Sequence, residues 1–102
     1  MSDIGQARKA LTARVLEGDG KASPAQRRAA FNNTGLAGPS GNLADKVARY
    51  AHAVSDEDIE AVKASGLSED QIFEIVVCAA LGQAMRQHES ALAALTAATR
   101  KG

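Results

Sequence analysis

The chain has 102 residues, and its 12 Lys and Arg balance 12 Asp and Glu, so the formal net charge is zero. This length predicts one domain, and the balanced charge argues against general nucleic-acid binding, which needs excess cations to displace counterions from phosphates. With no Trp, one Tyr and two Phe, the chain also lacks the aromatic side chains of a base-stacking surface. Bulky apolar residues are few, which predicts a thin core and makes self-association a hypothesis.

The apolar runs and the single cysteine indicate the cellular compartment of the protein. The longest apolar run, Ile75 to Leu81, is far too short to cross a membrane. The first residues, MSDIGQARKALTARVLEG, carry charges where a signal peptide needs an apolar stretch. The only cysteine, Cys78, cannot form an internal disulfide. We therefore expect a cytoplasmic protein without a membrane partner.

The first third of the chain predicts two short helices. Apolar residues at helical spacing predict a helix over residues 3–17; they are Ile4, Ala7, Leu11 and Val15. Ser23 is suited to cap a second helix that has Pro24 at its first position and runs to about Asn32. We interpret the Arg27-Arg28 pair within it as a solvated face.

A glycine-rich loop, GLAGPSGN, follows the second helix. Such loops can bind phosphate when they precede a helix. This one lacks the Lys-Ser/Thr ending of a P-loop, and no predicted strand comes before it. The loop therefore does not predict a phosphate site.

Helix signals continue through the second half of the chain. A third helix is expected over residues 42–53, with four residues on its inner face, Leu43, Val47, Tyr50 and Val54. Ser55 and the acids at 56–58 form a helix start, Gly66 follows the last turn, and Ser68-Glu69-Asp70-Gln71 is a second start. The last helix is long and reaches about Thr99. The predicted fold is all-α, a small bundle of about five helices, and the acids need no catalytic explanation.

The chemistry-bearing residues of the last helix are Glu74, Cys78 and His88. Spacings of four and three place them on one inner stripe with four apolar residues, Leu81, Met85, Leu92 and Leu95. Cys78 and His88 are ten residues apart, or about 15 Å along a helix. A thiolate–imidazolium pair could therefore form only between helices of different subunits. No metal site or cofactor is predicted, because metal binding needs further ligands nearby.

Each of these residues has a structural and a functional interpretation. The apolar neighbours of Cys78 favour a buried, inert thiol over a reactive one. His88 is interpreted as a hydrogen-bonded boundary residue, with a ligand role as the alternative. Glu74, if buried, would have a raised pKa and need a partner such as His52, Arg49 or Arg86. Gly82, in mid-helix, is expected to let another helix approach closely.

One segment resembles a known family. Leu43 to Leu95 contains VSDEDIEAVKASGLSEDQIFEIV followed by a long alanine-rich helix. It resembles the C-terminal half of carboxymuconolactone decarboxylase-like and alkylhydroperoxidase D-like proteins. The resemblance implies an all-α fold whose subunits assemble through their helices. Its redox members use E-x-x-C-x-x-C with a histidine four residues later, and its decarboxylase members act on a small lactone acid without that cysteine pair.

The chain departs from the redox pattern, since Leu81 stands where the second cysteine would be and His88 lies too far along. We expect a single domain over residues 1–102, with a helix and linker at 1–20 and the family-like core at 43–98. The leading hypothesis is a small homo-oligomer, joined through its C-terminal helix, with a binding or accessory role and a small-molecule ligand as one possible partner.

Two alternatives stay open. The first is an enzyme, either a one-cysteine peroxidase that uses Cys78 or a lactone decarboxylase-like catalyst. Glu74, His88 and either His52 or Arg86 would then supply the proton chemistry. The second is an unrelated helical module that binds a different protein.

Overall fold

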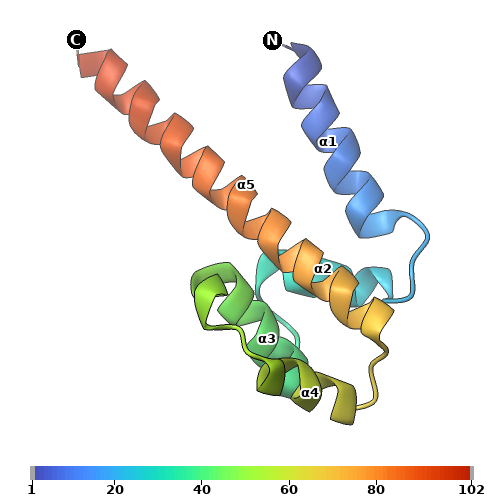
Figure 1. Ribbon diagram of the computed structural model, residues 1–102. Coiled ribbons are helices and arrows are strands. Elements are labelled where there is room, and N and C mark those ends of the chain that lie inside the picture. The colour runs from blue at the N-terminus through green and yellow to red at the C-terminus, as the bar shows by residue number, and fades with distance from the viewer. Residues whose placement is uncertain (1, 102) are drawn as a thin grey trace.

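A computed structural model describes the backbone of residues 2–101 and the side chains of residues 5–100. Within that part of the chain there are five α-helices, a short 3-10 turn and no strand (Figure 1). The elements are α1 (Ser2–Glu17), α2 (Pro24–Asn32), α3 (Gly38–Arg49), η1 (Ala51–Ala53), α4 (Asp56–Ala64) and α5 (Glu69–Lys101). The predicted all-α class and long C-terminal helix are confirmed.

The helices form a body with two projections. α2, α3 and α4 pack around the first half of α5, while α1 and the second half of α5 leave the body and diverge like the arms of a V (Figure 1). Residues 87–100, called the α5 arm from here on, have only exposed side chains. The shape is accordingly elongated, with extents of 54 × 28 × 20 Å. None of the described helices is both long enough and apolar enough to span a membrane.

The core is made mostly of small and aliphatic side chains. One buried cluster joins α1, α2, α3 and α5, and consists of Leu16, Ala30, Ala44, Ile75, Cys78 and Ala79. A second cluster joins α3, α4 and α5 through Leu43, Val62 and Ile72. Because alanines supply much of this contact, the helix axes must lie close together for the side chains to touch.

The helix starts form as the sequence predicts. The Ser23 side chain accepts a hydrogen bond from the backbone N–H of Gln26, and the Gln26 side chain accepts one from the N–H of Ser23. Ser68 and Gln71 make the same reciprocal pair at the start of α5. Gly66 precedes α5 with φ of 108°, a conformation that L side chains rarely adopt. These local signals therefore set where α2 and α5 begin.

The third helix differs from its predicted bounds. It begins at Gly38 rather than Asn42 and ends at Arg49, and residues 51–53 form a separate 3-10 turn. Pro39 is compatible with this earlier start because the first turn of a helix needs no N–H donor there. Tyr50, expected on the inner face, is 53% exposed, since the helix ends before it.

The predicted inner stripe of the last helix is right only as far as Met85: Glu74, Leu81 and Met85 are partly buried and Cys78 is buried. The body buries Ile72, Ile75, Cys78 and Ala79 of α5, and of the predicted stripe only Cys78 is among them. His88, Leu92 and Leu95 are exposed, because the body ends before the arm begins. On α1, Leu11 is half exposed, and the side chain of Ile4 lies outside the described residues. Apolar spacing therefore found a stripe that borders the body in the first half of α5 and leaves the body in the second half.

Gly82 is where α5 comes closest to α2. A Cβ atom at this position would overlap the carbonyl oxygen of Phe31, the next-to-last residue of α2. Arg86, one turn later, donates from Nη1 to that same oxygen at 2.6 Å. The predicted role of Gly82 in close helix packing is confirmed.

We predict opposite effects of Gly→Ala substitution at two helical glycines. Gly82→Ala forces α2 and α5 apart and should lower the free energy of unfolding by roughly 1–3 kcal/mol. Gly5→Ala in α1, where a Cβ meets no atom within 4 Å, should raise it by up to about 1 kcal/mol. Urea unfolding followed by circular dichroism measures both. Equal stability of the two variants would contradict the close crossing.

Candidate functional site

The structure brings two of the three predicted site residues together. Cys78 is 1% exposed in the core, and Glu74 lies one turn before it, partly buried against the linker between α1 and α2. Both line a cavity of about 330 Å³, together with Arg14, Asp19 and Arg27. His88 is exposed on the arm, about 15 Å further along α5. Within one copy of the chain, a Cys78–His88 pair therefore does not form.

Glu74 fastens the linker to α5. Its carboxylate oxygens accept hydrogen bonds from the backbone N–H of Lys21 at 2.8 Å and of Ala22 at 3.0 Å. Gly20 is packed so closely that a Cβ there would overlap the carboxylate. Burial raises the pKa of Glu74, but the hydrogen bonds from Lys21 and Ala22, with smaller help from nearby cations, outweigh it and hold the pKa below its ordinary value.

The partners predicted for Glu74 are wrong. Arg49 pairs with Asp45 on the surface, Arg86 is held by the carbonyl of Phe31, and His52 is exposed on the 3-10 turn. Backbone N–H groups take their place because the linker folds over this part of α5. The ionised carboxylate of Glu74 is therefore a structural anchor. Its surroundings do not raise its pKa, as a general acid would require.

Arg27 is buried, contrary to the prediction of a solvated face. It is 4% exposed rather than solvated, and its Nη1 donates to the carbonyl of Val15 at 3.1 Å. Its Nε is buried and has no hydrogen-bond partner among the described atoms. Arg28, the other member of the pair, is exposed, as predicted, and also forms an ion pair with Glu17. One signal could have separated them: Arg27 precedes the apolar Ala30 and Phe31 by three and four residues, so it shares their inner face.

The environment of Cys78 keeps its thiol protonated. Burial raises the pKa of Cys78; Arg27 opposes this increase, and the charge of Glu74 adds to it. Sγ donates a long, weak hydrogen bond to the carbonyl oxygen of Val15, at 4.0 Å. A thiol of this kind is a poor nucleophile at neutral pH, because the thiolate is the reactive form.

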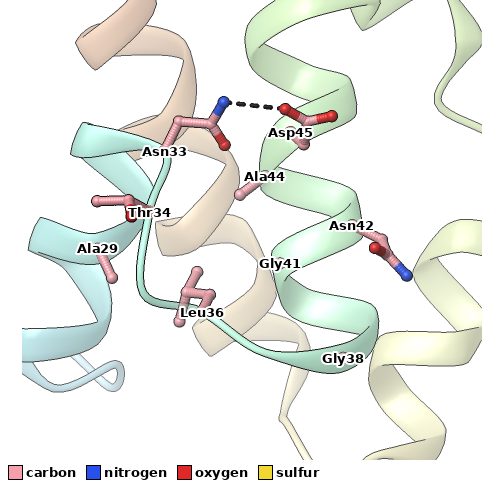
Figure 2. A pocket seen from close by; sticks show the side chains of 9 residues that line it. All are labelled: Ala29, Asn33, Thr34, Leu36, Gly38, Gly41, Asn42, Ala44 and Asp45. Atoms are coloured by element: carbon pink, nitrogen blue, oxygen red, sulfur yellow. Dashed lines mark hydrogen bonds between the residues drawn. The ribbon is translucent and has the colours of Figure 1, made fainter.

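The glycine-rich loop borders a different pocket. Figure 2 shows this pocket, of about 270 Å³, between the end of α2 and the start of α3. Asn33 donates from Nδ2 to Asp45 at 3.0 Å across its rim, and Gly38 and Gly41 form the floor on the α3 side (Figure 2). The Asp45 carboxylate is repulsive to phosphate, so this loop does not supply the anion site that glycine-rich loops can form.

A third hollow lies between the two projections. It measures about 660 Å³ and is lined by residues of α1 such as Arg8 and Lys9, and by Phe31, Met85 and Arg86.

Over the described residues, no three His, Cys, Asp or Glu side chains gather as metal ligands.

Comparison with known proteins finds no relative of this chain. No family model, no curated protein and no solved structure matches the chain. The interpretation of Glu74, Cys78 and Arg27 therefore rests on their own geometry.

We predict that Glu74 makes stability depend on pH in the acid range. Its pKa is lower in the folded than in the unfolded chain, so its contribution is present above the unfolded value and is lost as the pH falls through the folded one. Urea unfolding between pH 3 and 7 should show that the wild type exceeds Glu74→Gln at pH 7 and that the gap narrows towards pH 3. The same substitution at exposed Glu89, in the middle of α5, controls for general charge loss. A gap that is constant with pH would contradict the anchor.

We predict that the Cys78 thiol is protected. A thiol reagent should modify Cys78 far more slowly in the native than in the urea-unfolded protein at pH 8, because the native side chain is buried and its pKa is raised. Release of a chromophoric leaving group measures the rate. Fast native reaction below pH 7 would instead reveal an activated thiolate.

Proposed function

We propose that the protein is a small helical protein that self-associates through α5 and has a binding or accessory role without catalysis of its own. The observation that carries this proposal is the exposed α5 arm. Leu92 and Leu95 project from it with 49% and 61% of their surface exposed. A helix that extends beyond its own core gains most of its stability from packing against something else.

The surface area supports this proposal quantitatively. The chain exposes 6799 Å², whereas a compact monomer of its mass would expose about 5,400 Å². The radius of gyration is 15.5 Å, against about 13 Å for a compact chain of this length. The excess of about 1,400 Å² exceeds the roughly 800 Å² that each partner buries in a standard stable interface. The two projections therefore offer enough area for a dimer.

A second copy is favoured over a charged partner by the composition of the arm. Its charged residues are Glu89 and Arg100, and the chain as a whole has no net charge, so two copies do not repel each other. An acidic or basic partner would find little charge of the opposite sign to bind on the arm. The exposed leucines instead match a like surface, as in other isologous interfaces.

The absence of catalysis is proposed from the state of Cys78 and Glu74. A one-cysteine peroxidase needs a lowered thiol pKa and an accessible sulfur, and the surroundings of Cys78 favour neither. Glu74 is occupied by two backbone donors. The enzyme hypothesis keeps one supporting feature, the cavity shared by Glu74, Cys78 and Arg27, which could admit a small ligand. Peroxide consumption by the purified protein would be the result that revives it.

Membership of the carboxymuconolactone decarboxylase-like and alkylhydroperoxidase D-like group stays a proposal, as does a cytoplasmic location. The family proposal is supported by the segment VSDEDIEAVKASGLSEDQIFEIV and by its helices, α4 and α5, which begin at the predicted caps. Those caps are local chemistry that any helical hairpin can use.

We predict that one charge on the arm abolishes self-association. Wild type should run as a dimer or larger species at micromolar concentration in light scattering after size exclusion. Leu95→Glu, at the most exposed leucine of the arm, should shift it to monomer, because an unpaired carboxylate would be buried. Ala93→Glu, on the opposite side of the arm, should leave the assembly intact. A monomeric wild type would overturn the proposal, and co-purification of a different protein would favour the interaction module.

A further inference from the structure

One face of α5 carries a regular pattern of large and small side chains. Residues spaced alternately by three and four along it are Leu81, Ala84, His88, Ala91, Leu95 and Ala98. They form what we call the alanine–leucine face. Leu81 is partly buried and the other five are exposed. A repeat of seven residues is the spacing that keeps one helix in contact with another along a seam.

The alanine–leucine face is distinct from the surfaces that α5 already uses. The body contacts the side of α5 that carries Ile75, Ala79 and Gly82. Successive helical residues are 100° apart, which places the alanine–leucine face well over 90° from that side. No other described helix buries it beyond Leu81.

Charge is absent from this face and from its immediate border. Between residues 80 and 100 the charged side chains are Arg86, Glu89 and Arg100. All three project towards other sides of the helix, and Arg86 is already bound to the carbonyl of Phe31. Met85 and Leu92 extend the face on one flank. The surface is thus apolar enough to be desolvated without stranding a charge.

The order of large and small residues distinguishes two ways of pairing two copies. In a parallel pair, each residue faces its own counterpart, so Ala84 would face alanine and His88 would face histidine. Layers of two alanines leave voids between layers of two large residues, which is poor packing. A parallel pair is therefore disfavoured.

In an antiparallel pair every large residue meets an alanine. Leu81 faces the partner's Ala98, and Ala84 faces the partner's Leu95. His88 faces the partner's Ala91, on either side of a two-fold axis between these positions. The alanines allow the axes to approach to about 8 Å, the lower end of helix packing distances. The seam from Leu81 to Ala98 is about 26 Å long.

We infer that two copies of the chain pair through the alanine–leucine face as antiparallel α5 helices, in the register that opposes Ala84 with the partner's Leu95. This inference rests on the self-association proposed above and adds its orientation and register.

Disulfide trapping tests the orientation. In a Cys78→Ala background, Ala84→Cys and Leu95→Cys are made in separate chains, one carrying a size tag, mixed under reducing conditions and then oxidised. We expect the mixed disulfide between positions 84 and 95 to dominate. Disulfides joining 84 to 84 and 95 to 95 would show a parallel pair and overturn the inference. A dimer that forms none of these disulfides would overturn it too, while leaving self-association standing.

An exchange of residues tests the register. It leaves Cys78 in place, so it does not require that the Cys78→Ala variant folds. Ala84→Leu opposes two leucines, and Leu95→Ala leaves a void, so each should raise the dimer dissociation constant at least about tenfold. The double variant Ala84→Leu/Leu95→Ala restores one leucine opposite one alanine and should return the constant to near the wild-type value. Additive loss in the double variant would overturn the register. A monomeric wild type in the same measurement would overturn both the register and the proposed function.

Discussion

Gly82 brings the backbone of α5 against the carbonyl oxygen of Phe31 at the end of α2, and the rest of the body is arranged around that crossing. The approach is possible only without a Cβ, and Arg86 satisfies the carbonyl from the next turn. Ala30 and Ala79, both fully buried, continue the contact with side chains short enough to keep the axes close. A core with so few bulky residues depends on this closeness, because small side chains touch only when the backbones do.

The polar contacts around Glu74 follow from the same geometry. Once α2 lies against α5, the linker from α1 must cross the start of α5, and its backbone N–H groups need acceptors. Glu74 supplies two of them at a point where Gly20 leaves room for the carboxylate. Arg27 ties α2 to the end of α1 through the carbonyl of Val15. Residues with the composition of an active site thus serve to close the body, and they hold Cys78 beneath them as a buried thiol.

Local signals in the sequence were enough to predict the helices but not their packing. Ser23, Ser55 and Ser68 carry capping information within three residues, so the starts of α2, α4 and α5 could be derived without the fold. Burial depends on contacts between distant segments. The linker that covers Glu74 comes from more than fifty residues away, and nothing adjacent to Glu74 in the sequence indicates it.

The same limit explains the error on α5, whereas helical spacing alone could have separated Arg27 from Arg28. Arg27 and Arg28 look alike in a sequence, yet the inner face of α2 buries one and exposes the other. On α5, helical periodicity indicated an apolar face and could not tell whether the body or another molecule covers it. Cys78 was placed correctly because its apolar neighbours predict burial by either surface.

The two apolar faces of α5 lie along different parts of its length. From Ile72 to Gly82 the helix is a core element, and its small residues let α2 and α3 approach. Beyond Arg86 the body ends, while the helix continues for the length of the arm with alanine and leucine still at regular spacing. Alanine has the highest intrinsic helix propensity, which favours a helical arm, but propensity alone gives no reason for leucines at solvent-exposed positions. A second helix against the arm accounts for both residues at once, since alanine sets a close distance and leucine fills the space that alanine leaves opposite it.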